Sequence, residues 1–324
     1  MEENTEQRVD LTLFSEKIQE LKDRIASVIV GQEQTVDLVL TAILANGHVL
    51  IEGVPGVAKT LLARLTARLI DADFSRVQFT PDLMPSDVLG TTVFNMKTNA
   101  FDFHQGPIFA DIVLVDEINR APAKTQAALF EVMEERQISI DGTTHRMGDL
   151  YTILATQNPV EQEGTYKLPE AQLDRFLMKI TMDYPSLEEE VNILERHHTN
   201  AALVKLDDIV PAITKEELLS LRAFMNQVFV DRTLLQYIAL IVQQPRTSKA
   251  VYLGASPRAS VAMLQSSKAY ALLQGRDFVT PEDIKFVAPY VLQHRLILTA
   301  EAEMEGYSPV KVTQRLIDKV EVPK

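Results

Sequence analysis

The stretch Gly53-Val54-Pro55-Gly56-Val57-Ala58-Lys59-Thr60 decides the fold, because it joins an apolar run of strand length at His48–Glu52 to a helical pattern. The helical pattern places four leucines on one face: Leu61, Leu62, Leu65 and Leu69. Glycines in such a loop let backbone N–H groups turn inward around phosphate oxygens, and the next helix directs its positive end toward them. The stretch therefore predicts a phosphate-binding loop.

Lys59 and Thr60 give this loop its expected chemistry. Lys59 is expected to reach the β and γ phosphates of a nucleotide, and the Thr60 hydroxyl to ligate magnesium. Ala58 stands where the general pattern has its second glycine. Alanine adds only a methyl group and tolerates helical dihedral angles, so we expect it to be accepted at the helix entry. A plain Gly/Pro turn is the alternative, and the Lys-Thr pair argues against it.

Outward from the loop, strand-length apolar runs alternate with helical patterns as far as Pro185. The predicted strands are His48–Glu52, Arg76–Phe79, Ile112–Val115, Tyr151–Thr156 and Leu177–Thr181. The run Ile112–Val115 is apolar on both faces, which is typical of a parallel sheet covered by helices on both sides. The first part of the chain is therefore predicted to be an α/β nucleotide-binding domain.

Two further segments of this domain are predicted hairpins. Thr91–Phe103 turns around Lys97-Thr98-Asn99, and Gln137–Met147 turns at Asp141-Gly142, a strong two-residue hairpin signal. Neither hairpin belongs to a minimal α/β unit, so both are expected to be insertions.

After Pro185 the strand-like runs disappear and helix start signals replace them. Capping boxes and cap-proline pairs are expected at four sites: Ser186 with Glu189, Thr214 with Glu217, Ser256-Pro257 and Thr280-Pro281. The predicted division is an α/β core over residues 1–185, a connecting helix and linker over 186–207, and an all-helical lid over 208–324.

Asp116 and Glu117 directly follow the buried strand at Ile112–Val115. Charges at the carboxyl end of a parallel strand lie at the crevice where such sheets bind ligands. Asp116 is the expected magnesium-side carboxylate, and Glu117 the base that orients and polarises the attacking water. Alone, two acids after a strand are usually a solvated strand end, and the phosphate loop upstream favours the functional interpretation.

Asn158 follows the apolar run Leu150–Thr156 and precedes Pro159, which is expected to end the strand. Its amide could therefore contact the γ-phosphate or the attacking water at the same edge of the sheet. As an isolated pair, Asn-Pro indicates only a turn.

Two arginines stand near the predicted sheet and lid. Arg175 follows Asp174, and from the sequence alone this is most often a surface ion pair. Arg258 falls in the first turn of a predicted helix, where the helix dipole disfavours a cation. A cation at this disfavoured position indicates that Arg258 faces an anionic ligand.

The composition excludes several classes of protein. The chain has 324 residues, 32 Lys+Arg against 45 Asp+Glu for a net charge of −13, and no cysteine. This charge argues against coating nucleic acid or anionic lipid, and the lack of cysteine excludes thiolate chemistry and disulfides. The acidic N-terminus is unlike a secretory signal, and no apolar run approaches the roughly 18 residues that a membrane-spanning helix needs. The histidines, including His197-His198, are assigned no metal role. A cytoplasmic protein without membrane spans is expected.

Five stretches together resemble the MoxR family of AAA+ ATPases, over nearly the whole chain from about Val28 to Tyr290. They are Gly-Val-Pro-Gly-Val-Ala-Lys-Thr, Leu-Val-Asp-Glu-Ile-Asn-Arg-Ala-Pro, Ala-Thr-Gln-Asn-Pro, Leu-Pro-Glu-Ala-Gln-Leu-Asp-Arg-Phe and Gly-Ala-Ser-Pro-Arg-Ala. In that family the alanine before the lysine is ordinary. The sequence departs from the family at Lys167, where proline is frequent. The sequence also ends soon after the lid, so we expect a partner to supply specificity.

The resemblance implies a fold and a set of site residues. The fold is a five-stranded αβα core with a helical lid and the hairpin insertions of the helix-2-insert clade. Asn158 would be the sensor 1 residue, Arg258 the sensor 2 residue that links lid to γ-phosphate, and Arg175 an arginine finger donated to the next subunit. The implied nucleotide-binding residues are Val30, Gly31, Gln32, Gly53, Val54, Pro55, Gly56, Val57, Ala58, Lys59, Thr60 and Leu61.

The resemblance also implies an activity. Such proteins bind ATP and Mg²⁺, form homo-oligomeric rings that are often hexamers, and act as chaperone-like ATPases on protein clients beside von Willebrand factor A domain proteins. One alternative is a nucleotide-gated scaffold with little turnover, against which Glu117 and Arg175 argue. Another is a DNA-remodelling ATPase, but the predicted hairpins carry only Lys97 against Asp102 and Arg146 against Asp141, too little positive charge to follow phosphates.

Overall fold

A five-stranded parallel sheet forms the centre of the first domain. This computed structural model describes residues 11–158, 165–199 and 206–323; the N-terminal segment, the segment that begins with Pro159 and its expected strand-ending role, and the segment after Thr199 lie outside the described residues. The strands are β1 (Val49–Gly53), β2 (Phe74–Gln78), β5 (Ile112–Asp116), β8 (Thr152–Gln157) and β9 (Met178–Met182). Their order is β2-β5-β8-β1-β9, and every neighbouring pair is parallel, which confirms the predicted sheet.

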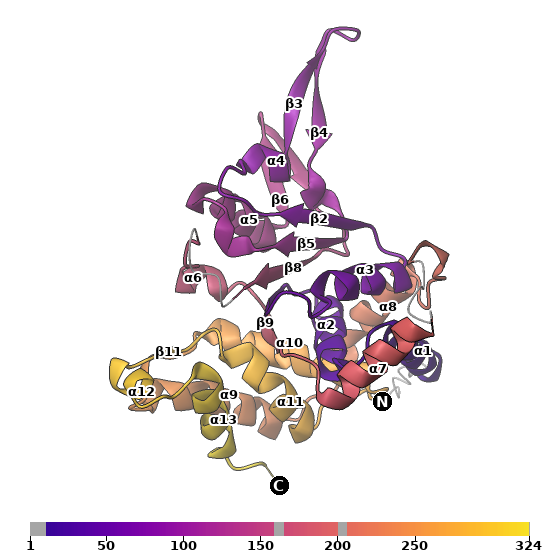
Figure 1. The fold of residues 1–324 in the computed structure, drawn as a ribbon. Helices are drawn as coiled ribbons and strands as arrows, with labels where there is room; N and C mark the ends of the chain where they lie inside the picture. Colours follow the sequence, from indigo (N-terminus) through magenta and orange to yellow (C-terminus); the bar gives the residue numbers. More distant parts are fainter. Residues whose placement is uncertain (1–10, 159–164, 200–205, 324) are drawn as a thin grey trace, which may run out of the picture.

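Helices cover both faces of the sheet (Figure 1). The helices of this domain are α1 (Thr12–Val28), α2 (Glu33–Leu44), α3 (Lys59–Leu69), α4 (Pro85–Leu89), α5 (Ala123–Glu135) and α6 (Glu170–Leu173), with the short turns η1 (Pro107–Phe109) and η2 (Ile118–Arg120). In β5, Ile112 and Leu114 face the apolar cluster that contains α2 and α3, whereas Val113 and Val115 face the cluster that contains α5. This alternation explains why the strand is apolar at every position.

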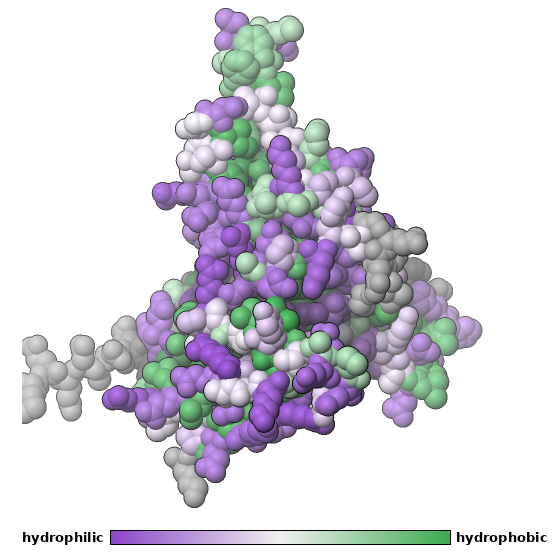
Figure 2. Space-filling view, turned by 90° about the vertical axis from the view of Figure 1, so that its left-hand side faces the viewer, coloured by the Kyte–Doolittle hydropathy of each residue, from purple (hydrophilic) through white to green (hydrophobic). Residues whose placement is uncertain are grey.

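Both predicted hairpins are confirmed. β3 (Gly90–Asn95) pairs with β4 (Ala100–Gln105), and β6 (Gln137–Ile140) pairs with β7 (Thr143–Arg146). Asp141 and Gly142 have φ values of 49° and 80°, which a type I′ turn requires at both central positions. The β3–β4 hairpin projects from the core, and its outer part carries hydrophobic colour in Figure 2. Four of its side chains are exposed hydrophobics: Val93, Phe94, Met96 and Phe101.

The C-terminal part is mostly helical, as predicted. Its elements are α7 (Leu187–His198), η3 (Leu206–Asp208), α8 (Lys215–Phe224), η4 (Met225–Gln227), α9 (Arg232–Thr247), α10 (Pro257–Leu273), α11 (Pro281–Leu292), α12 (Ala300–Met304) and α13 (Pro309–Asp318). All four predicted caps are present, with Ser186, Thr214, Ser256 and Thr280 each accepting a backbone N–H in the first turn. None of the helices within the described ranges is long and apolar enough to cross a membrane.

The expectation of an all-helical lid is wrong in one detail. β10 (Val251–Leu253) and β11 (Ile297–Leu298) form a short antiparallel ladder. Strands this short leave no alternating pattern in the sequence, and their pairing joins residues far apart in the chain.

The lid is joined to the core by a continuous apolar cluster. α10 packs against α2, and α11 packs against β9. Lid residues such as Ile284 and Val287 belong to the same buried cluster as Leu38 and Ile43 of α2. The start of the lid helix α10 is therefore held in a fixed place relative to the sheet.

Candidate nucleotide-binding site

The phosphate loop runs from the carboxyl end of β1 into α3. Gly56 has a φ of 90°, which glycine adopts without strain. Ala58, the cap residue of α3, has φ 61° and ψ 22°, in the left-handed region. The expectation that Ala58 takes helical dihedral angles is therefore wrong, because the loop must turn before the helix begins at Lys59. A left-handed alanine costs about 1–2 kcal/mol, so the surrounding loop must stabilise this conformation.

The side chain of Lys59 folds back into the phosphate loop, which Lys59 follows in the chain. Its ammonium Nζ donates hydrogen bonds to the carbonyl oxygens of Gly53 and Val54, the second at 3.3 Å. Partial burial lowers the pKa of Lys59, and the negative charges of Asp116 and Glu117 act in the opposite direction. The lysine is thus placed between the loop and the two carboxylates, where phosphate oxygens would be better acceptors than the carbonyls.

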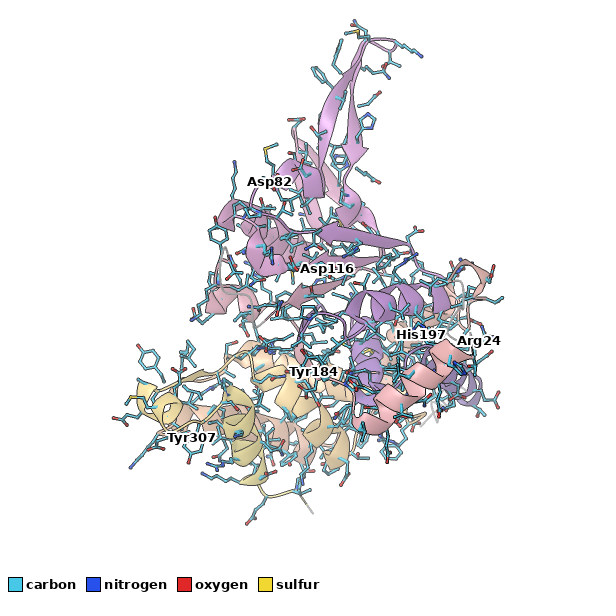
Figure 3. All side chains as sticks on the ribbon, in the orientation of Figure 1. Arg24, Asp82, Asp116, Tyr184, His197 and Tyr307 are labelled. Atoms are coloured by element: carbon cyan, nitrogen blue, oxygen red, sulfur yellow. The ribbon has the colours of Figure 1, made fainter. Side chains whose placement is uncertain are left out.

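The buried hydroxyl of Thr156 joins the two carboxylate residues at the end of β5. Its Oγ1 accepts the backbone N–H of Glu117 at 3.0 Å and donates to Asp116 Oδ1 at 3.1 Å. Glu117 has a φ of 57°, so the chain turns sharply there and directs the two side chains differently. Asp116 is buried inside the core domain, where Figure 3 labels it. The side chain of Thr156 therefore fixes this turn from the neighbouring strand.

Three side chains that the sequence did not single out hold these carboxylates. Arg76 Nε lies 2.6 Å from Asp116 Oδ2, and Gln78 Nε2 donates to Glu117 Oε2 at 2.8 Å. Arg120 Nε lies 2.8 Å from the same Glu117 oxygen. Arg76 and Gln78 are alternate residues on β2, so they share a face, but only the strand order shows that β2 neighbours β5.

Asn158 is buried directly after β8. Because β8 lies between β1 and β5, Asn158 stands at the carboxyl edge of the sheet between the phosphate loop and the two carboxylates. This is the edge at which the sequence placed it. The structure thus brings Lys59, Thr60, Asp116 and Glu117 to one edge with Asn158.

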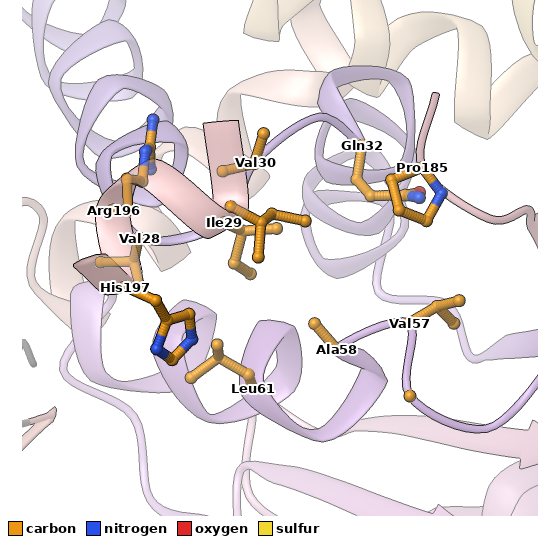
Figure 4. A pocket seen from close by; sticks show the side chains of 12 residues that line it. Val28, Ile29, Val30, Gln32, Val57, Ala58, Leu61, Pro185, Arg196 and His197 are labelled. Atoms are coloured by element: carbon orange, nitrogen blue, oxygen red, sulfur yellow. The ribbon is translucent and has the colours of Figure 1, made fainter. Parts of the chain in front are cut away.

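A cavity of about 240 Å³ lies beside the phosphate loop (Figure 4). Of the residues expected to bind nucleotide, Val30, Gln32, Gly56, Val57, Ala58 and Leu61 line it. The sequence missed the other lining residues: Val28, Ile29, Pro185, Ile193, Arg196 and His197. His197 was expected to be simply solvated; it is exposed, but it also lines this cavity from α7. Mostly apolar walls beside a phosphate loop suit the flat ring of a nucleobase.

Arg175 and Arg258 lie together, away from the phosphate loop. Arg175 Nε is 2.8 Å from Glu134 Oε2, and Arg258 Nη2 is 2.6 Å from Glu134 Oε1. Glu134 is at the end of α5, where the carbonyl of the adjacent Met133 is 3.1 Å from the Nε2 atom of His48, at the amino end of β1. The two arginines are therefore at the opposite end of the strands from Lys59.

This placement corrects the expected role of Arg258. The strand β1 alone, at about 3.3 Å per residue, separates the two ends of the sheet by more than the reach of an arginine side chain. In the described arrangement Arg258 therefore does not link the lid to a phosphate bound by its own subunit. Only the packing of the lid on the core shows this, because the sequence gives no direction for the start of α10.

Two family models match the chain. The model of the ATPase family associated with various cellular activities (AAA) matches residues 48–178, and that of the AAA lid domain matches residues 243–318. The fold and the site thus define an ATPase of the AAA+ class.

Three similar proteins narrow the class. The uncharacterized protein YeaC of Bacillus subtilis is 47% identical over 301 residues, covering 93% of each chain. Chaperone MoxR1 of Mycobacterium tuberculosis is 44% identical over 309 residues, covering 93% of this chain and 81% of the relative. The crystal structure of a proposed ATPase from Cytophaga hutchinsonii superimposes with a TM-score of 0.89 at 40% identity, covering 97% of each chain. The chain belongs to the MoxR family of AAA+ ATPases.

Proposed function

We propose that this chain hydrolyses Mg-ATP at sites shared between neighbouring subunits of a ring, and that it uses hydrolysis to remodel or assemble protein partners. In this proposal residues 1–185 form the ATPase core, 186–207 connect, and 208–324 form the lid. The observation that carries it is the separation of the arginines from the phosphate loop. Arg175 and Arg258 lie at one end of the sheet, both paired with Glu134, while Lys59 and Glu117 lie at the other.

Within one subunit, the carboxyl edge of the sheet would hold the nucleotide. The base would lie in the cavity beside Val30 and Leu61, and the phosphates in the loop that ends at Lys59. The Thr60 hydroxyl and Asp116 carboxylate are the hard oxygen donors that Mg²⁺ prefers, and Asp116 already faces a cation, Arg76. When bound, Mg²⁺ would neutralise phosphate charge.

Glu117 is the proposed base. Gln78 and Arg120 both contact its Oε2 atom, and the Thr156 hydroxyl holds its backbone, so the carboxylate has a fixed direction. A fixed carboxylate can orient a water molecule for attack and accept its proton. Asn158, at the same edge, would position that water or the γ-phosphate.

The neighbouring subunit would complete the site. Arg175 and Arg258 are 30% and 58% exposed and share Glu134 as partner, so both guanidiniums can reach a second molecule. Positive charge at the γ-phosphate stabilises the charge that develops there, as arginine fingers do. We therefore assign both residues to the subunit interface, and hydrolysis would require assembly.

Mixing two inactive variants tests this arrangement. Arg175→Ala should bind ATP normally and lose on the order of 10³-fold in turnover. Glu117→Gln should bind ATP and turn over at least about 100-fold more slowly. A mixture should regain part of the activity, because some interfaces then combine an intact Glu117 with an intact Arg175. If mixed rings form and no mixture regains activity, either Arg175 acts within its own subunit or hydrolysis needs concerted action around the ring. A wild-type specific activity that stays constant as the protein concentration rises would then refute the shared site.

The protein client would contact the β3–β4 hairpin. Its exposed hydrophobics Val93, Phe94, Met96 and Phe101 suit a polypeptide better than a phosphate backbone. The Glu117→Gln protein, which should hold ATP without turnover, is the form with which to capture clients and von Willebrand factor A domain partners. Capture of the client should fail when Phe94 and Phe101 of the hairpin are replaced by serine. If capture persists in that variant, the hairpin is not the contact.

A further inference from the structure

Every N–H donor of the Arg295 guanidinium forms a hydrogen bond. The acceptors belong both to the lid, which carries Arg295, and to the core. Arg295 follows α11, and its side chain is only 3% exposed. Nε donates to Asp174 Oδ1 at 2.7 Å, and Nη2 donates to the carbonyl oxygens of Asp174 at 3.2 Å and Phe176 at 2.6 Å. Nη1 donates to the carbonyl oxygens of Leu177 at 3.2 Å and of Val291. A guanidinium has five N–H donors, so all are used.

The bonded core segment is the one that carries Arg175. The preceding lid residues bind the same stretch of backbone: His294 Nε2 lies 3.1 Å from the carbonyl oxygen of Phe176, and Gln293 Nε2 donates to that of Lys179. Burial lowers the pKa of His294 well below its usual value, so the ring is neutral and donates from Nε2. Three consecutive lid residues therefore fix the backbone on both sides of Phe176, next to Arg175.

Asp174 extends this network to Arg258. While its Oδ1 pairs with Arg295, its Oδ2 accepts a hydrogen bond from Ser256 Oγ at 3.0 Å. Ser256 caps α10, and the same Oγ accepts the backbone N–H of Arg258 at 3.2 Å. The carboxylate of Asp174 thus connects the residue before Arg175 to the helix turn that carries Arg258.

The arginines of this cluster differ in how accessible they are. Three guanidiniums, those of Arg175, Arg258 and Arg295, are paired with two carboxylates, those of Asp174 and Glu134. Glu131 and Glu135 of α5 line the same pocket as Arg175, so the neighbourhood is close to neutral. Arg295 is 3% exposed, whereas Arg175 and Arg258 keep 30% and 58% of their side-chain surface accessible.

We propose that Arg295, Asp174 and Ser256 are positioning residues, which hold Arg175 of the core and Arg258 of the lid in one rigid arrangement for delivery to the neighbouring subunit. The inference rests on the proposed function, in which both arginines act on a neighbour's phosphates. Long arginine side chains lose much freedom when they are fixed, and a rigid base reduces that cost at the moment of reaction. Loss of the connection between core and lid would let the two guanidiniums move independently.

Ser256→Ala tests the connection with little change to the fold. It removes the hydrogen bond to Asp174 and the cap of α10 together. Ser308→Ala is the control, because Ser308 also caps a helix, α13, before a proline, and its hydroxyl bonds the backbone N–H of Lys311 and not an arginine of the cluster. Both variants lose a helix cap, and Ser256→Ala should lose somewhat more thermal stability because the hydrogen bond to Asp174 goes too. Ser256→Ala should lose about 10- to 100-fold in kcat with an unchanged KM for ATP, whereas Ser308→Ala and Ser256→Thr should keep the wild-type kcat.

A double-mutant cycle separates positioning from general stability. In an Arg175→Ala, Arg258→Ala background, adding Ser256→Ala should not lower the residual kcat further, because there is no guanidinium left to position. A further loss equal to that in the wild-type background would overturn the proposal.

Arg295→Lys is the second variant, since it keeps the charge but offers fewer and less directed donors. It should reduce kcat in the same way as Ser256→Ala. If Ser256→Ala and Arg295→Lys keep the wild-type kcat while Arg175→Ala is inactive, the positioning role is refuted and the shared site is not. Wild-type kcat in Arg175→Ala would instead refute the shared site.

Discussion

Replacing Thr156 by valine tests the hydroxyl that joins Asp116 to Glu117. Valine has nearly the same shape, but it cannot accept the Glu117 N–H or donate to Asp116 Oδ1, bonds of 3.0 and 3.1 Å in the structure. A buried group left without its partner costs about 1–3 kcal/mol. Thr156 is only 2% exposed, so water cannot replace either bond. We therefore expect a loss of about 2–4 kcal/mol of stability, or roughly 3–6 °C in Tm for a chain of this length.

The same change should affect catalysis more than binding. Glu117 keeps its contacts to Gln78 and Arg120, but its left-handed backbone loses the bond that fixes it. Turnover should fall about 10- to 100-fold, as for a small displacement of a catalytic group. ATP affinity should stay near that of the wild type, because Lys59 and its loop are unchanged.

The assay combines thermal melts, nucleotide binding and steady-state phosphate release at 25 °C, and the melts check that each variant is folded at that temperature. Thr156→Ser is the control, because it keeps the hydroxyl and loses only a methyl group; it should retain most of the turnover. Wild-type turnover in Thr156→Val would refute the reasoning, since Glu117 would then be positioned without this hydroxyl.

Three further predictions concern the loop and the core. Lys59→Ala should weaken ATP binding by about 1.5–3 kcal/mol, because it removes a charge-assisted contact; a variant with wild-type Kd in an equilibrium titration would contradict this. Ala58→Gly should stabilise the protein by about 0.5–1 kcal/mol, since its φ of 61° suits glycine, whereas Ala127→Gly in the exposed interior of α5 should cost about that much. Burial lowers the pKa of His48 to about 3 in the folded protein. In the unfolded chain the same imidazole is protonated below about pH 6.5, so lowering the pH stabilises the unfolded state. Stability should therefore fall by about 2 kcal/mol more between pH 7 and pH 5 in the wild type than in His48→Gln, and equal losses in melts at both pH values would argue against this.

Features that depend on neighbouring residues were determined by the sequence alone. The phosphate loop, the Asp141-Gly142 hairpin and the cap of α10 at Ser256 each need only residues a few positions apart. Their chemistry is local: a positive φ suits glycine, and a cap hydroxyl meets an N–H of the same turn. The apolar run at β5 was likewise predictable, because a strand buried on both faces needs apolar residues throughout.

Features that depend on which distant segments meet were decided only by the tertiary structure. Arg76 and Gln78 reach the carboxylates because β2 neighbours β5, and Arg258 lies beside Arg175 because α10 packs against α2. Residues Asp174 and Arg295 are 121 positions apart, and nothing in either local sequence indicates their ion pair. Strand order and helix packing result from the burial of the whole apolar surface at once. No short stretch of sequence contains that information.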